Sequence, residues 1–85
     1  SNSGLVDKTS ARTSLNDLLK IIGEQHENTI EDARGEAETL GGLVIEVAGR
    51  ILKNNEYIVL GDLKLIVESS DKKRVKSVKV CIDAK

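Results

Sequence analysis

The segment Thr39-Leu40-Gly41-Gly42-Leu43-Val44-Ile45-Glu46-Val47-Ala48-Gly49-Arg50-Ile51-Leu52 is the most apolar run in this 85-residue sequence. Its apolar side chains recur at the spacing of one helical face, at Leu40, Leu43, Val44, Val47, Ala48 and Ile51. Thr39 is a suitable N-cap for this helix, and Gly49 ends it. Because Ile45 and Leu52 widen the apolar stripe, we expect a helix that is buried on more than one side and around which the rest of the chain packs.

Two consecutive glycines, Gly41 and Gly42, occupy the first turn of this expected helix. A glycine inside a helix costs about 1 kcal/mol relative to alanine, so the pair indicates that something approaches the backbone closely. One explanation is a neighbouring strand. The other is a phosphate-bearing ligand, such as FAD or another nucleotide, bound at the helix start by Thr39, Gly41 and Gly42. The pair lacks a Walker lysine and a GxGxxG spacing, so close packing is the favoured interpretation.

The chain before this segment predicts a strand and a helix. Residues 5–12 suit a short edge strand. A helix of about ten residues then follows, with Thr13 as its candidate N-cap and Gly23 as a left-handed C-terminal cap. Its apolar residues form a single stripe, at Leu15, Leu18, Leu19 and Ile22.

Residues 24–38 are strongly acidic and show no sustained period. They predict an exposed connection with at most one turn of helix. His26, Glu27 and Glu31 lie within this stretch, but a lone histidine with two carboxylates matches no recognised ligand pattern. We therefore predict no metal site there.

The C-terminal half predicts an antiparallel meander. A turn at residues 53–56 leads to a strand at residues 57–60, and Gly61-Asp62 forms a two-residue, glycine-first hairpin turn. Side chains alternate between two faces over residues 63–68, which predicts the second strand of the hairpin, and a last strand covers residues 74–82. The apolar phase changes within that last strand, which predicts a β-bulge near Lys76 and Ser77. The fold class is α+β, with two helices packed on a small antiparallel sheet.

Composition excludes several functions. Tyr57 is the single aromatic residue, and 13 basic side chains balance 14 acidic ones, so nucleic-acid binding is not expected. One histidine and one cysteine, Cys81, supply no nucleophile–base pattern, so we expect a non-enzymatic protein with no catalytic residues. No apolar run approaches the roughly 20 residues of a membrane span, so this segment is not expected to insert into a membrane directly.

Four segments in order resemble the transporter-associated domain of CorC/HlyC proteins. Those segments are Ala11-Arg12-Thr13-Ser14-Leu15-Asn16-Asp17-Leu18, Thr39-Leu40-Gly41-Gly42-Leu43-Val44 with Gly49-Arg50-Ile51, Gly61-Asp62-Leu63 with Ile66-Val67-Glu68, and Lys73-Arg74-Val75 with Val78-Lys79-Val80. They are similar to the family patterns G/A-x-T-x-L-x-D-L, T-[LVI]-G-G-[LF]-[VI] with G-R-I, GGLRFTVLE, and RRI with VRV. The sequence departs from the family where Lys53-Asn54-Asn55-Glu56-Tyr57 stands in place of a P-x-x-G-D turn, and its acidic connection is longer.

The resemblance covers nearly the whole chain and implies one domain over residues 5–85. The start Ser1-Asn2-Ser3, without Met, predicts that residues 1–4 are a tag remnant or linker. The resemblance implies a fold shared with FAD-binding domains, with no cofactor required and FAD possible by analogy of fold. It further implies an accessory domain of a hemolysin-like or magnesium and cobalt efflux transporter, on the cytoplasmic face of the bacterial inner membrane. The expected partners are the upstream CBS and membrane regions of the parent chain, or a second copy contacted through the apolar helix or a sheet edge.

Overall fold

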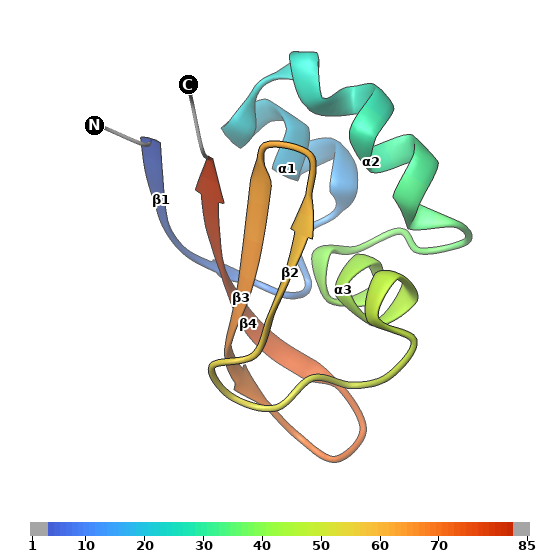
Figure 1. Cartoon of the computed structure of the whole chain (residues 1–85), viewed down its shortest axis with the longest axis vertical. Helices are drawn as coiled ribbons and strands as arrows, with labels where there is room; N and C mark the ends of the chain where they lie inside the picture. Colours follow the sequence, from blue (N-terminus) through green and yellow to red (C-terminus); the bar gives the residue numbers. More distant parts are fainter. Residues whose placement is uncertain (1–3, 83–85) are drawn as a thin grey trace.

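The computed structural model describes residues 4–82 as an α+β fold (Figure 1). In chain order its elements are β1 (Gly4–Ser10), α1 (Leu15–Ile22), a single 3-10 turn η1 (Glu24–His26), α2 (Glu27–Arg34), α3 (Leu40–Ala48), β2 (Tyr57–Leu60), β3 (Leu63–Ser70) and β4 (Val75–Ile82). The expected α+β class is confirmed, and the described part contains three α-helices rather than the two expected. The ends of the domain assigned to residues 1–4 and 5–85 lie partly outside the described residues.

The four described strands form one antiparallel sheet in the order β1-β4-β3-β2. β1 is therefore an edge strand, as predicted, and the meander of β2, β3 and β4 is confirmed. Leu60 pairs with Leu63 across the Gly61-Asp62 turn, and Gly61 has the positive φ of 57° that a glycine-first turn requires. The bulge expected near Lys76 is also present, because β4 pairs through Ser77 and Val75 and skips Lys76. A second irregularity on β3 skips Glu68.

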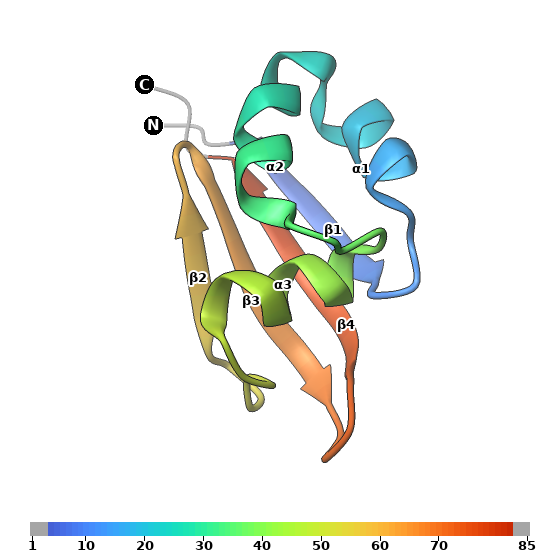
Figure 2. The same cartoon turned by 90° about the vertical axis from the view of Figure 1, so that its right-hand side faces the viewer.

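The helices cover one face of the sheet, and the core lies between the two layers (Figure 2). Alternate residues of β3 and β4 face this core, among them Leu63, Leu65, Val67, Val78 and Val80, all fully buried. The predicted stripe of α1 packs there, since Leu15, Leu18, Leu19 and Ile22 are buried. The core contains no aromatic ring, so its stability comes from aliphatic area alone.

The N-cap of α1 is Ser14 rather than the predicted Thr13. The Ser14 Oγ accepts a hydrogen bond from the Asp17 amide at 3.1 Å. The Thr13 carbonyl oxygen instead accepts a hydrogen bond from the Leu40 amide at 2.9 Å, which links Thr13 to the start of α3. Gly23 does end α1 with a positive φ of 105°, but its ψ of 142° lies outside the left-handed helical region that we expected.

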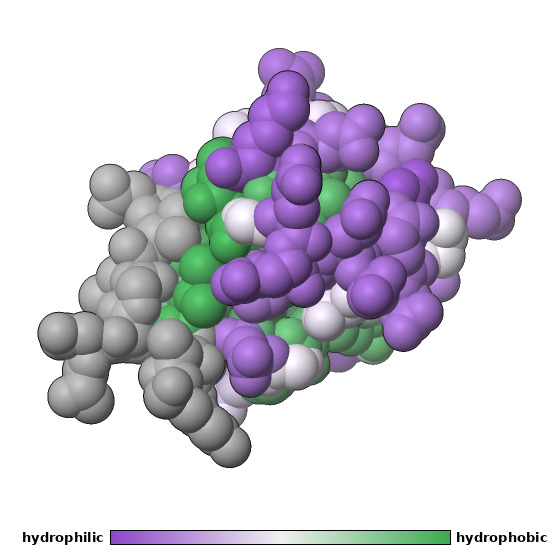
Figure 3. Space-filling model, turned by 90° about the horizontal axis from the view of Figure 1, so that it is seen from above, coloured by the Kyte–Doolittle hydropathy of each residue, from purple (hydrophilic) through white to green (hydrophobic). Residues whose placement is uncertain are grey.

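The acidic segment forms a helix, so the prediction of an exposed connection over residues 24–38 was wrong. α2 is held by Ile30, which is completely buried, and by the half-buried Ala33. One apolar anchor with flanking small residues gives too little periodic signal to predict a helix from sequence, yet it suffices when a sheet and a neighbouring helix lie beneath it. Figure 3 looks down on this end of the molecule, where hydrophilic side chains cover most of the surface.

α3 begins and ends close to the predicted positions. Gly49 is its C-cap in the left-handed conformation, with φ 76° and ψ 7°. Leu40, Leu43 and Val44 are fully buried, and Gly41 is buried next to them against Ala11 and Val75. Ile45, which we expected to widen the buried face, is only half-buried. Ile51, assigned to the same stripe, lies beyond the end of the helix and is half-buried. None of the described helices is long and apolar enough to cross a membrane.

Candidate functional site

The start of α3 is the first candidate site, because it carries Thr39, Gly41 and Gly42. Thr39 is the N-cap, and its Oγ1 accepts a hydrogen bond from the Gly42 amide at 3.2 Å. Its backbone also forms an isolated antiparallel bridge with Ser14. Thr39 therefore joins the beginnings of α1 and α3, as well as capping its own helix.

The backbone amides at the start of α3 are all bonded within the protein. The Leu40 amide donates to the Thr13 carbonyl and the Gly41 amide donates to the Ala11 carbonyl, each at 2.9 Å. The Leu43 amide donates to the Thr39 carbonyl, also at 2.9 Å. A helix N-terminus binds a phosphate through free N–H groups. Here a phosphate would have to displace a bond to Thr13, Ala11 or Thr39.

Both glycines lie where another part of the backbone comes close. A Cβ added to Gly41 would lie 2.9 Å from the Cβ of Ala11 and 3.5 Å from the carbonyl oxygen of Val75. A Cβ added to Gly42 would lie 3.2 Å from the Cβ of Ala37. The close-packing interpretation of this pair therefore has a direct structural basis. Gly41 lets α3 approach the end of β1 and the start of β4, and Gly42 lets residues 37–39 fold over the helix.

A small hollow of about 210 Å³ lies beside these glycines. It is lined by Ala11, Arg12, Thr39, Gly41, Gly42, Ile45, Arg74 and Val75. The exposed side chains of Arg12 and Arg74 give it a positive charge that would suit an anion. Its volume is below the roughly 300 Å³ at which small-molecule pockets begin, and a dinucleotide would extend far outside it.

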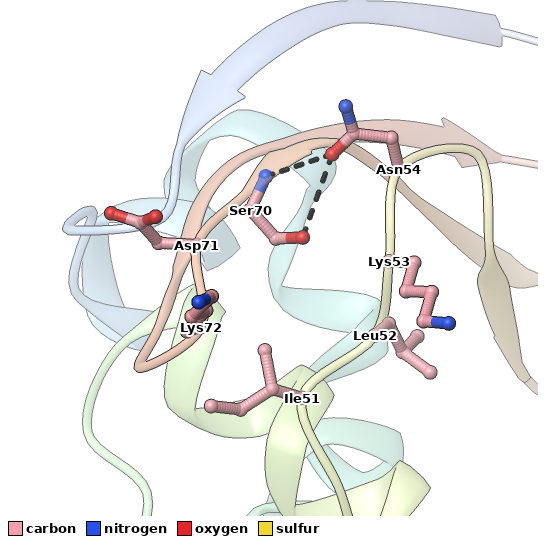
Figure 4. A pocket seen from close by; sticks show the side chains of 7 residues that line it. All are labelled: Ile51, Leu52, Lys53, Asn54, Ser70, Asp71 and Lys72. Carbon is pink, nitrogen blue, oxygen red and sulfur yellow. Dashed lines mark hydrogen bonds between the residues drawn. The ribbon is translucent and has the colours of Figure 1, made fainter.

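A second hollow, of about 560 Å³, lies between the α3–β2 connection and the β3–β4 hairpin (Figure 4). Its lining residues are Ile51, Leu52, Lys53, Asn54, Ser70, Asp71 and Lys72. Asn54 and Ser70 face each other within it, and the Asn54 Oδ1 accepts from the Ser70 amide at 3.0 Å and from the Ser70 hydroxyl at 3.5 Å. These bonds use the Asn54 side-chain oxygen and the amide and hydroxyl of Ser70. Sequence analysis predicted a turn at Asn54 and did not predict this contact.

An ion pair closes the connection between α3 and β2. The Arg50 guanidinium donates two hydrogen bonds to the Glu56 carboxylate, at 3.0 and 2.8 Å, and the Lys53 amide donates a third at 2.7 Å. These bonds, the one from Arg50 foremost, lower the pKa of Glu56 from 4.5 to about 2. Arg50 and Glu56 are six positions apart and have no periodic relation, so sequence analysis missed the pair.

The sheet face turned away from the helices is the other candidate site. Alternation along β2, β3 and β4 places there a group of residues that we call the open face, namely Tyr57, Val59, Lys64, Ile66, Lys79 and Cys81. The register puts Ile66 beside both Tyr57 and Lys79, and it puts Lys64 beside Val59 and Cys81. The Lys64 Nζ lies 4.3 Å from the centre of the Tyr57 ring, within the range of a cation–π contact.

The residues considered for a metal site do not assemble into one. His26 is buried, and its Nε2 lies 3.4 Å from the Gln25 Nε2. Glu27 and Glu31 are exposed on α2, and Glu31 pairs with Arg34 at 3.1 Å. Within residues 4–82, no group of histidine, cysteine and carboxylate side chains is arranged to hold a metal ion.

A known protein family matches nearly the whole chain. The family model CorC_HlyC, described as a transporter associated domain, matches residues 8–83. No curated protein sequence matches the chain.

Solved structures with the same fold come from several bacteria. One is a region from Neisseria meningitidis MC58 described as associated with a Mg²⁺ and Co²⁺ transporter (CorC), with 25% identity and a TM-score of 0.72 over 91% of this chain and 86% of that one. A CorC_HlyC domain from Haemophilus ducreyi has 14% identity and a TM-score of 0.70, covering 100% of this chain and 95% of its own. A third, from a Xylella fastidiosa Temecula1 hemolysin in complex with Mg²⁺ and Mn²⁺, has 16% identity and a TM-score of 0.69, covering 95% and 98%.

Proposed function

The chain belongs to the CorC_HlyC family of transporter associated domains, and from this membership we propose that it is a non-catalytic accessory domain of a membrane transporter. The parent is of the hemolysin-like or magnesium and cobalt efflux type, and the domain works at the cytoplasmic face of the bacterial inner membrane. It packs against the upstream CBS and membrane regions of its own chain and thereby modulates ion transport. The similarity to the Neisseria region associated with a Mg²⁺ and Co²⁺ transporter supports this choice of parent.

The observation that carries the proposal is the one-sided cover of the sheet. All three described helices lie on one face, and the other face presents Tyr57, Val59 and Ile66 among lysines. Tyr57 and Val59, two positions apart on β2 and therefore neighbours on this face, are 55% and 59% exposed. Apolar side chains rimmed by charge are typical of a surface that contacts another protein.

Binding to the parent can be tested on the open face directly. Titration calorimetry of this chain against the upstream part of the parent should give saturable binding. Ile66→Glu replaces an apolar side chain at the centre of the open face by a carboxylate and should abolish the heat of binding, because a charge is costly to desolvate in an interface. Asn28→Glu adds the same charge on the exposed surface of α2 and is the matched control. Absence of binding by the unmodified chain would refute the docking proposal.

Modulation of transport needs its own measurement. In cells that express the full parent, Ile66→Glu should change the rate of Mg²⁺ efflux, and Asn28→Glu should leave the rate at the wild-type value. Equal rates for all three proteins, with equal amounts in the membrane, would separate docking from regulation and leave the domain a purely structural role.

A second candidate function is binding of a phosphate-bearing nucleotide such as FAD at Thr39, Gly41 and Gly42. The positive charge of Arg12 and Arg74 beside the small hollow favours it. The bonded amides of α3 and the volume of about 210 Å³ weigh against it. A thermal shift on addition of FAD or ATP that is lost in Arg12→Ala would support this function. A colourless preparation with no shift from either nucleotide would exclude it.

A further inference from the structure

β2 forms one edge of the sheet, and no other described segment pairs with its outer side (Figure 2). The strand consists of Tyr57-Ile58-Val59-Leu60 and carries no charge, no proline and no bulge. The opposite edge differs, since β1 contains Asp7 and Lys8 and its register shifts between Leu5 and Lys8. Charges and bulges are the devices that keep a sheet edge from pairing with another strand. The β1 edge has both features, and the β2 edge has neither.

The pairing of β2 with β3 determines which backbone groups point outward. The Val67 amide donates to the Glu56 carbonyl at 2.8 Å, and Leu60 and Leu63 flank the two-residue turn. In an antiparallel ladder the hydrogen-bonded residues alternate, so Ile58 and Leu60 bond to β3. The N–H and C=O groups of Tyr57 and Val59 therefore point away from the sheet.

The same two residues have the exposed side chains. Tyr57 is 55% exposed and Val59 is 59% exposed, both on the open face. An unpaired backbone and an uncovered apolar surface thus coincide in two residues. An added strand would satisfy the backbone groups and place its own side chains beside these two in a single contact.

We propose that β2 pairs with β2 of a second copy of this chain, antiparallel and in a two-fold register that places Ile58 opposite Ile58. In this register, Tyr57 of each copy exchanges two hydrogen bonds with Val59 of the other, so every outward group of the strand is paired. The Tyr57 and Val59 side chains become cross-strand neighbours on the open face, a favourable aromatic and β-branched combination. The two sheets join into one continuous sheet.

Two features of the strand favour a second copy over an unrelated peptide. Asn55, with φ 72°, and Gly61, with φ 57°, bend the chain at the two ends of β2. The edge available for pairing is therefore four residues long, which equals the length of a second β2 strand. The two ends of the edge carry opposite net charge: Arg50 and Lys53 outweigh the ion-paired Glu56 before the strand, and Asp62 follows it. Antiparallel pairing brings the lysine end of one copy toward the aspartate end of the other. The contact is short, below the roughly 1,200 Å² of a stable interface, so it forms at high protein concentration or when two copies are held together.

Amide hydrogen exchange on the full 85-residue chain tests this register residue by residue. The amides of Ile58 and Leu60 are bonded to β3 and should be protected at every concentration. The amides of Tyr57 and Val59 should exchange rapidly in dilute protein. As the protein concentration rises, their exchange rate should fall in proportion to the fraction of monomer. Sedimentation equilibrium on the same samples should report a monomer–dimer equilibrium with the same midpoint.

Variants of Val59 separate this edge from other surfaces. Val59→Pro removes an outward N–H that β3 does not use, which an edge strand tolerates. Val59→Lys adds a charge to the edge and keeps the N–H. Both should lose dimerisation while retaining the far-UV circular dichroism of the wild type. Ser77→Lys adds the same charge on β4, away from this edge, and should dimerise as the wild type does.

Three results would overturn the proposal. The first is a chain that stays monomeric at millimolar concentration with unchanged exchange at Tyr57 and Val59. The second is a dimer that survives Val59→Pro and Val59→Lys, which would place the contact elsewhere. The third is protection of Tyr57 and Val59 only after the upstream part of the parent is added, which would assign the edge to a strand of that part.

Discussion

Gly41 and Ala11 meet in a contact that leaves no room for a methyl group: the Gly41 amide donates to the Ala11 carbonyl at 2.9 Å, and a Cβ on Gly41 would lie 2.9 Å from the Ala11 Cβ. Real side chains do not approach so closely, and the atom in the way is a Cβ, which cannot move without the backbone. The end of β1 and the first turn of α3 are thereby fixed against each other.

Replacement of this glycine should destabilise the fold. We expect Gly41→Ala to lower the free energy of unfolding by about 1–3 kcal/mol through overpacking, offset by up to about 1 kcal/mol of improved helix propensity. Gly42→Ala should cost less, because its new methyl group would lie 3.2 Å from Ala37 in a loop, whereas the larger side chain of Gly42→Leu should destabilise clearly. Urea denaturation measures each variant. The double variant Gly41→Ala with Ala11→Gly should recover most of the loss, and a stabilised Gly41→Ala protein would contradict the contact.

The cap of α1 offers a matched pair of substitutions. Ser14→Ala removes the hydroxyl that accepts a hydrogen bond from the Asp17 amide and should lower the free energy of unfolding by about 1 kcal/mol. Thr13→Ala leaves that bond intact, and the Thr13 carbonyl still accepts from Leu40, so its cost should be smaller. Thermal denaturation of the two proteins under the same conditions decides the assignment. A larger loss for Thr13→Ala would restore the residue that the sequence predicted.

Ile30 should hold α2 in place. It is completely buried and is the one buried residue of the helix. Ile30→Ala should therefore cost about 2–5 kcal/mol and increase hydrogen exchange throughout Glu27–Arg34. Asn28→Ala, at an exposed position of the same helix, is the control. Unchanged protection of α2 in Ile30→Ala would show that other contacts hold the helix.

The Arg50–Glu56 pair should make stability depend on acid pH. The pKa of Glu56 is lowered from 4.5 to about 2 in the folded protein, so the unfolded chain takes up a proton first. The stabilising contribution of the pair is complete above pH 4.5 and is lost as pH falls toward about 2. Glu56→Gln should therefore lower the Tm at neutral pH, and its difference from the wild type should shrink on acidification. The pair is solvent-exposed, so added salt should also reduce the difference.

Asp62→Asn is the matched control for that pH series. Asp62 is exposed and takes part in none of the ion pairs found among residues 4–82. Its removal should leave the difference between neutral and acid pH close to that of the wild type. A Glu56→Gln protein that followed the same acid profile as the wild type would mean that the pair contributes nothing in solution.

The parts of the fold that sequence analysis predicted correctly are those with dense local information. α3 combines an N-cap, a long apolar stripe and Gly49 as its left-handed end, and the β2–β3 hairpin is determined by Gly61-Asp62 between alternating residues. The helix α2 could not be predicted, because its stability comes from the pocket that the folded protein provides for Ile30. The choice between Thr13 and Ser14 depended on α3, whose Leu40 amide uses the Thr13 carbonyl.

The candidate site was predicted less completely for the same reason. The sequence singled out Thr39, Gly41 and Gly42, and the structure brings them together at one junction beside Arg12 and Arg74. The bonds that occupy the amides come from Ala11 and Thr13, far away in sequence. The exposure of Tyr57 and Val59 could not be predicted either, because alternation along a strand identifies two faces and does not say which face the helices will cover.

Tyr57, the single aromatic residue of the chain, lies outside the core. Its intrinsic fluorescence is therefore a poor reporter of unfolding, since the ring is already in contact with water when the protein is folded. The same position makes it a built-in probe of the β2 edge and open face, free of background from any other aromatic side chain. A change in tyrosine emission without a change in far-UV circular dichroism would signal that this surface has become occupied.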